Sequence, residues 1–162
     1  EFFGQRVSNI LEESGIKYDV VNAVMASGWD DVSDTLRRAE ALTEFRDNPD
    51  FESLLTGYTR AANLAKKSEA ASINEDLFEE GAERELYAAY LEISSKVEDY
   101  LAAGEYVGAL HEIGKLRGPI DRYFDEVMVM VDNEKVKTNR LGLLKRIASL
   151  VEPIGELSQI VV

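Results

Sequence analysis

Apolar residues recur at helical spacing along nearly the whole chain. No stretch shows the sustained alternation of a strand with turn residues on both sides. The pattern therefore predicts an all-α fold, a helical bundle of about seven to eight helices in a single domain over residues 1–162. The helices are expected at about residues 2–14, 18–26, 31–45, 50–70, 75–102, 105–116, 119–131 and 134–151.

Residues that start and stop helices support these boundaries. Gly15 suits the position after a helix, where a left-handed backbone is common. Asp30 or Asp31 can cap the third helix, and Asn133 lies in a turn that can cap the last one. Pro49 is expected at the first position of the fourth helix, where its missing N–H costs nothing.

Two helical assignments rest on weaker signals. The apolar run at residues 127–131, Val-Met-Val-Met-Val, is short enough to be a strand. With no partner strand in the sequence, we assign it to the end of the seventh helix. The fifth helix is expected to open at residue 75 because an early acidic cluster suits the positive end of a helix dipole. That cluster consists of Glu75, Asp76, Glu79 and Glu80.

The composition indicates a cytosolic globular domain. The chain has no cysteine, which excludes disulfides and thiolate zinc sites. No apolar run approaches the roughly 20 residues that a membrane span needs, and the first residues do not resemble a signal peptide. Because the chain does not begin with methionine, it is expected to be a domain cut from a longer polypeptide.

The net charge of −13 argues against nucleic acid when it is taken alone. The charge is unevenly distributed, however, because residues 115–146 are net +3 and the remainder of the chain is −16. A second basic island at residues 60–67 contains no acid. Salt limits the reach of surface repulsion to about 8–10 Å, so a local basic surface can act within an acidic protein.

Few of the patterns that mark enzymes are present. His111 is the single histidine, so two-histidine metal motifs are excluded, and no Gly-x-Ser-x-Gly elbow presents a serine. The glycines at 114 and 118 lack the Gly-Lys-Ser/Thr ending of a phosphate loop. The acidic run at 75–85 lacks the ligand spacing of a calcium loop. We therefore expect no catalysis, no metal and no cofactor in this domain.

A known family does share the most distinctive motifs of the chain. The segment PIDRYFDEVMVMVD at residues 119–132 is followed by NRLGLL at 139–144. Together they resemble the C-terminal end of the beta subunit of the bacterial heterotetrameric glycyl-tRNA synthetase, where a Pro-x-Asp-x-Phe-Phe-Asp-x-Val-Met-Val-Met segment precedes Asn-Arg-Leu. TRAANLAK at residues 59–66 is similar to a Lys-Arg-x-x-Asn-Ile-x-x-Lys segment of that family. The resemblance extends over about residues 2–158.

The resemblance implies a helical anticodon-binding domain of the DALR type, as in the arginyl and cysteinyl class I synthetases. Its partners would be glycine tRNA, the rest of the beta subunit and the alpha subunit, with neither DNA nor a membrane involved. ATP and glycine would be used by the alpha subunit. This domain would support tRNA selection and carry no chemistry of its own.

The first candidate contacts lie on the fourth helix. At 100° per residue, Arg60, Asn63 and Lys67 fall on one outward face, opposite its apolar side. Two cations and an amide suit an RNA loop, because cations hold phosphates and amides bond base edges. The alternative is an ordinary solvated helix face, and the family resemblance favours RNA contact.

The last helix offers a second group of candidates. Lys135, Asn139 and Arg146 share one side of it and are expected to contact RNA. Arg140 instead falls near the middle of the apolar side. A buried charge needs a partner, so we expect Arg140 to form a structural ion pair with Asp121 or Asp125 on the neighbouring helix.

A rival from another class remains open. A purely structural helical module that docks a protein partner through its acidic surface would explain the charge of −13 directly. In that case the basic islands would be incidental.

Overall fold

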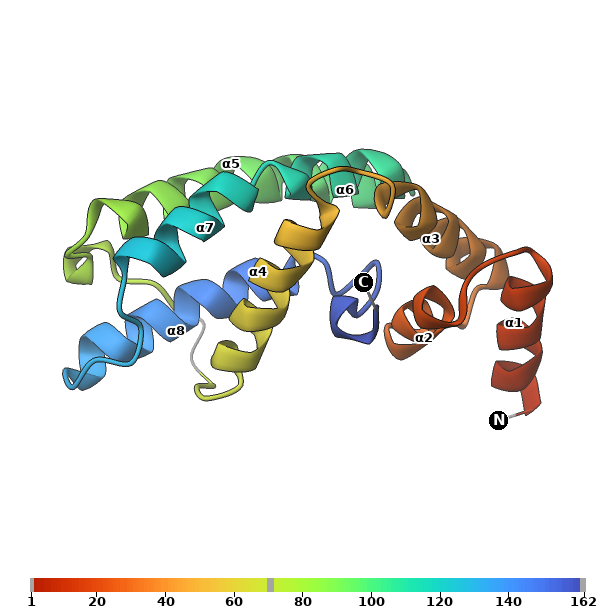
Figure 1. Cartoon of the computed structure of the whole chain (residues 1–162), viewed down its shortest axis with the longest axis horizontal. Coiled ribbons are helices and arrows are strands. Elements are labelled where there is room, and N and C mark those ends of the chain that lie inside the picture. The colour runs from red at the N-terminus through yellow and green to blue at the C-terminus, as the bar shows by residue number, and fades with distance from the viewer. Residues whose placement is uncertain (1, 70–71, 161–162) are drawn as a thin grey trace.

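The computed structural model describes residues 2–69 and 72–160, and within these ranges every regular element is a helix (Figure 1). The all-α prediction is therefore confirmed. The elements in chain order are α1 (Phe2–Glu13), α2 (Tyr18–Ala26), α3 (Val32–Phe45), α4 (Phe51–Ala65), η1 (Glu75–Leu77), α5 (Gly81–Ala102), α6 (Tyr106–Gly114), α7 (Arg117–Glu126), α8 (Glu134–Ser149) and η2 (Leu157–Gln159), where η denotes a 3-10 helix.

The helices form two groups that share one continuous core. In Figure 1, α5 and α7 run along the upper side, with α4 and α8 below them, and α1–α3 make up the right-hand end. α6 joins the groups because it packs against both α3 and α5. The C-terminal segment with η2 lies between α2 and α4 and closes the gap between the two groups.

Several predicted helix ends are confirmed by their hydrogen bonds. Gly15 has φ +87°, and the N–H of the next residue, Ile16, donates to the carbonyl of Leu11 over 3.1 Å. The carboxylate of Asp31 accepts from the N–H of Asp34 at 3.1 Å and caps α3. The side chain of Asn133 accepts from two N–H groups in the first turn of α8.

The fourth and fifth helices differ from the prediction at their ends. α4 begins at Phe51, two residues after Pro49, which therefore lies in the preceding turn rather than at the first helical position. The expected fifth helix is divided into η1 and α5. Between them Phe78 is extended, which buries its ring in edge contact with Tyr87. α5 then starts with a capping box, because the side chains of Glu80 and Glu83 bond each other's backbone N–H.

The assignment of residues 127–131 to the seventh helix is wrong. α7 ends at Glu126, and the segment that follows is neither helix nor strand. Val127 and Val129 are buried, whereas Met128 and Met130 are exposed. Buried and exposed side chains thus alternate along this non-helical segment, with the two valines in the core and the two methionines at the surface.

Gly108→Ala is expected to destabilise the fold, although alanine is the better helix former. A Cβ at position 108 would lie 2.4 Å from a ring carbon of Tyr100, so the contact between α5 and α6 would have to shift. We expect the free energy of unfolding, measured by chemical denaturation, to fall by about 1–3 kcal/mol.

Gly118→Ala provides the matched control, because a Cβ there would meet nothing within 4 Å. In the first turn of α7 the added methyl should leave stability unchanged or raise it by up to about 1 kcal/mol. Equal stability of the two variants would contradict the close packing inferred at Gly108.

Candidate nucleic-acid interface

A groove of about 640 Å³ runs beside the outward face of α4. Arg60, Asn63 and Lys67 all line it, and the structure therefore brings together the three residues that the helical pattern placed on one face. Ser158 and Ile160 of the C-terminal segment form the opposite wall. The lining contains two cations and no carboxylate, so the groove is a basic feature on an acidic protein.

The position of Arg60 is set by a ring of α7. Its guanidinium carbon lies 4.2 Å from the centre of the Phe124 ring, in a cation–π contact. Such a contact fixes the guanidinium plane but leaves the N–H donors along its edge available for an anion. Phe124 thus helps to orient Arg60 at the edge of the groove.

A second hollow, of about 400 Å³, adjoins the groove. The two share Thr59, Asn63 and Ser158. The hollow lies between α4, the end of α2, the end of α8 and the C-terminal segment, and it is lined by small and apolar side chains with polar groups among them. This hollow was not predicted from the sequence, because four segments far apart in the chain build it.

Tyr58 belongs to the wall of this hollow and carries an unusual hydroxyl group. The side chain is buried, and its oxygen has no hydrogen-bond partner among the described residues. An unpaired buried hydroxyl costs about 1–3 kcal/mol. Burial also raises the pKa of Tyr58, so the group stays a neutral O–H at physiological pH.

A buried arginine holds the C-terminal wall in place. Arg38 of α3 donates to the carbonyls of Val24 at 3.3 Å and Ile154 at 3.1 Å. The N–H of Glu156 adds a bond of 2.9 Å to the carbonyl of Ala23. These bonds hold the C-terminal segment against α2 and α3. That segment forms one wall of the groove beside α4 and one wall of the hollow next to it.

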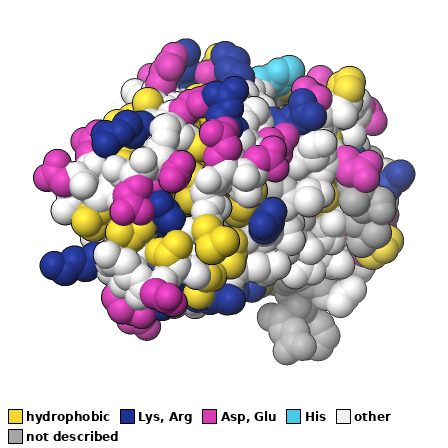
Figure 2. Space-filling model, turned by 60° about the vertical axis from the view of Figure 1, so that its left-hand side comes forward, with side chains coloured by type: hydrophobic (Ala, Val, Ile, Leu, Met, Phe, Trp, Pro, Cys, Tyr) yellow, Lys and Arg dark blue, Asp and Glu magenta, His cyan; other side chains and the backbone are white. Residues whose placement is uncertain are grey.

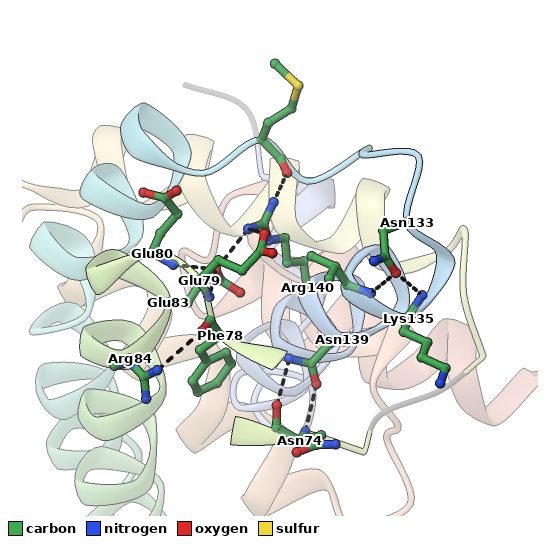
Figure 3. Close-up of polar contacts among 12 residues, drawn as sticks. Asn74, Phe78, Glu79, Glu80, Glu83, Arg84, Asn133, Lys135, Asn139 and Arg140 are labelled. Atoms are coloured by element: carbon green, nitrogen blue, oxygen red, sulfur yellow. Dashed lines mark hydrogen bonds and ion pairs between the residues drawn. The ribbon is translucent and has the colours of Figure 1, made fainter. Parts of the chain in front are cut away.

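Asn139 was expected to contact RNA, and the structure contradicts this. The side chain is 4% exposed and its amide makes two bonds to the backbone of Asn74, as Figure 3 shows. Its oxygen accepts from the Asn74 N–H at 2.7 Å, and its nitrogen donates to the Asn74 carbonyl at 3.1 Å. Asn139 therefore anchors the segment before η1 to α8, a contact between residues 65 positions apart.

The other two candidates on α8 lie apart from the groove. Lys135 is exposed in the first turn, beside the hollow that Asn74 and Thr138 line. Arg146 is half-buried in the last turn. Neither lines the groove beside α4 or the hollow next to it. The structure thus unites the α4 candidates at one place and leaves those of α8 separate from them.

Arg140 is buried and ion-paired, as its position on the apolar side of α8 predicts, but the predicted partners are wrong. It lies 3.0 Å from the carboxylate of Glu83 and 3.2 Å from that of Glu79, and it donates to the carbonyl of Met128 at 2.6 Å (Figure 3). Asp121 and Asp125 are exposed on the outer side of α7. The start of α5 and the segment just before it, not α7, supply the carboxylates.

Other kinds of site find no support in the described part of the chain. Residues 2–69 and 72–160 contain no cluster of side chains suited to a metal ion. None of the helices in the same ranges has the length and apolar character of a membrane span. His111 is exposed on α6. On the face drawn in Figure 2, acidic and basic side chains are interspersed and form no single basic patch.

Comparison with known proteins places the chain in a family. The model of the DALR anticodon binding domain matches residues 54–160, which include most of α4, the whole of α8 and the C-terminal segment up to residue 160. The chain belongs to the DALR anticodon-binding domain family.

Curated relatives of this DALR domain are similar in sequence to the chain over nearly all of its 162 residues. It is 42% identical to the glycine–tRNA ligase beta subunit of Desulforamulus reducens over 162 residues, which is 100% of this chain and 23% of that protein. The beta subunits of Desulforudis audaxviator and Clostridioides difficile are each 41% identical, over 98% and 99% of this chain respectively. The chain thus spans about a quarter of the length of these relatives and is homologous to that part of them.

Arg140→Met is expected to lower the stability of the domain sharply. Removal of the guanidinium leaves the Glu83 carboxylate buried without its partner, and such a loss costs about 3–5 kcal/mol. The thermal midpoint, followed by circular dichroism, should therefore fall by several degrees. Adding Glu83→Gln should recover part of the loss, because no unpaired buried charge then remains.

Arg122→Met serves as the control, because it removes an exposed ion pair with Glu85. A pair of that kind contributes about 0–1 kcal/mol. If both arginine variants were equally stable, the buried pair would not have the structural weight assigned to it.

Proposed function

We propose that this domain binds the anticodon arm of glycine tRNA as part of a glycyl-tRNA synthetase and thereby supports tRNA selection. The observation that carries the proposal is the acid-free groove beside α4, which lies within the segment matched by the DALR anticodon binding domain. The glycine–tRNA ligase beta subunits among the relatives indicate the amino acid.

The groove has the chemistry that a single-stranded loop requires. Sequence-specific RNA recognition uses unpaired bases, with phosphates held by arginine and lysine and base edges bonded by amides. Arg60 and Lys67 would hold phosphates, and Asn63 between them would bond a base edge. The charge of −13 lowers the affinity, but screening over about 8–10 Å keeps the repulsion local.

Two cations of α8, Lys135 and Arg146, would have a secondary part. We assign Lys135 and Arg146 to phosphates of the same tRNA outside the anticodon loop, because neither lines the groove. Asn139 has no part in the proposed interface, because the oxygen and the nitrogen of its side-chain amide both bond the backbone of Asn74.

The remaining steps of glycylation would take place elsewhere in the synthetase. In this proposal the alpha subunit uses ATP and glycine, and the rest of the beta subunit connects it to this domain. The complex would work in the cytoplasm. The domain itself needs no cofactor to hold an RNA loop, because phosphate and base contacts suffice.

The decisive experiment is a titration of the chain at low salt with glycine tRNA and with the same tRNA carrying an altered anticodon. We expect tighter binding of the unaltered tRNA, because the loop bases lie in the groove. Equal binding to both RNAs, or no binding to either, would overturn the proposal and favour a module that docks a protein through its acidic surface.

Arg60→Glu with Lys67→Glu is expected to weaken tRNA binding by at least about tenfold at low salt, because two attractive side chains then repel the phosphates. The dependence of log K on log salt should also become shallower, by about 0.7 for each single-strand phosphate that the protein no longer neutralises. Filter binding or fluorescence anisotropy over a salt series would measure both effects.

The matched control reverses Arg6 and Lys17, two exposed cations of the α1–α2 region that do not line the groove. Both double variants have the same net charge, so the control isolates position from total charge. Equal weakening of tRNA binding by the two would reject the groove as the binding surface, and circular dichroism would check that each variant is folded.

A further inference from the structure

We propose that a second groove, between α3 and α6, is a docking site for a basic amphipathic helix of a protein partner. This α3–α6 groove consists of two hollows, of about 450 and 250 Å³, which share Ala41, Glu44 and Val107. No residue that lines it also lines the groove beside α4 or the hollow next to that groove. The inference therefore does not rest on RNA binding.

The floor of the α3–α6 groove is apolar. Ala41 and Phe45 of α3 are buried there, and Gly108 of α6 contributes no side chain. Val107, in the first turn of α6, is 38% exposed and lines both hollows. One exposed valine is ordinary on a protein surface. At the junction of two hollows, however, a partner can cover it together with the apolar floor.

Carboxylates from both helices surround this floor. Glu40, Glu44 and Asp47 follow α3, and Glu105 is the N-cap residue of α6. Glu40, Glu44 and Glu105 are exposed, and none of them has an ion pair within residues 2–69 and 72–160. The fold thus leaves their charge without a counter-charge, and the groove attracts a cationic partner and repels phosphate.

The arginine of the groove is engaged elsewhere. Arg37 lies 3.6 Å from the carboxylate of Asp34, which also accepts a hydrogen bond from the hydroxyl of Tyr106. The guanidinium packs over the turn before α6, where a Cβ on Gly104 would lie 2.9 Å from one of its nitrogens. Arg37 therefore does not neutralise Glu40 or Glu44, and its contacts hold one end of the groove in shape.

The spacing of the carboxylates favours a helix as the occupant. Glu40, Glu44 and Asp47 are four and three positions apart, so they form one stripe about 10 Å long on α3. A partner helix with lysine or arginine at the same spacing can face this stripe and place an apolar side chain on Val107. A metal ion is a poor alternative, because the described residues contain no cluster suited to one.

The test uses a synthetic helix as its probe. It is an amidated peptide of about 18 residues, or five helical turns, made of leucine, alanine and lysine with the lysines along both edges of a leucine stripe. A control peptide has glutamate in place of every lysine. Calorimetric titration at physiological salt screens distant surface charges. We expect the chain to bind the basic peptide and not the acidic one, and no binding of the basic peptide would overturn the proposal.

Glu40→Lys with Glu44→Lys is expected to weaken binding of the basic peptide by at least about tenfold, because two attractive charges become repulsive. The matched control is Glu75→Lys with Asp76→Lys, two exposed acids of η1, which packs against α8. Both double variants have the same net charge, so the control should change the affinity by about twofold or less. Equal weakening by the two would assign the attraction to total charge and reject the groove.

A second pair of variants tests the apolar contact. Val107→Ser should weaken binding of the basic peptide about threefold to fivefold, since a partly exposed valine would no longer be covered. Leu91→Ser on α5 is the control, because Leu91 is 48% exposed and lines neither hollow. The same affinity for both serine variants would overturn the proposed docking site. Circular dichroism checks that every variant is folded.

These titrations contain no RNA, and their outcome is therefore independent of the proposed function. If the groove variants lose the peptide while glycine tRNA fails to bind the chain, the docking site stands and anticodon binding is rejected. If tRNA binds and the groove variants behave as their controls do, the docking site is rejected and the proposed function stands.

Discussion

One buried guanidinium, that of Arg140, joins three segments that are far apart in the chain. Arg140 lies on α8 and forms an ion pair with Glu83 at the start of α5. It also donates a hydrogen bond to the carbonyl of Met128, in the segment that follows α7. A charge in the interior is tolerated only when it is paired and hydrogen-bonded. The hydrogen bond to the Met128 carbonyl also ties the segment after α7 to α8.

The same device operates at the other end of the molecule. Arg38 is buried on α3 and donates hydrogen bonds to a carbonyl of α2 and to one of the C-terminal segment. Non-helical segments have unpaired carbonyls that need donors, and arginine supplies several donors from one side chain. Two of the arginines in this acidic chain therefore hold the scaffold together, so basic character alone does not identify an RNA contact.

The proposed RNA-binding surface depends on these anchors. The groove beside α4 and the hollow next to it both use the C-terminal segment as a wall, and Arg38 fixes that segment. Arg60 is oriented in turn by Phe124, which α7 carries. A chain with net charge −13 can thus present an acid-free groove, because its acids are distributed over other surfaces. Its local arrangement, more than its total charge, governs what it can bind.

The sequence alone determined the helices with long apolar stripes and clear caps, and the burial of Arg140. Helical periodicity, a glycine after α1 and asparagine before α8 are local signals, so they act whatever the rest of the chain does. It also placed Arg60, Asn63 and Lys67 on one face, because residues three and four apart on a helix are neighbours.

Only the tertiary structure decided which carboxylates pair with Arg140, that Asn139 bonds Asn74, and that residues 127–131 are not helical. It also decided that a hollow lies between four separate segments. The physical reason is common to all of these. Each of these features depends on which segments meet in space. A buried charge or amide requires a partner, but the residue itself does not indicate which part of the chain supplies that partner.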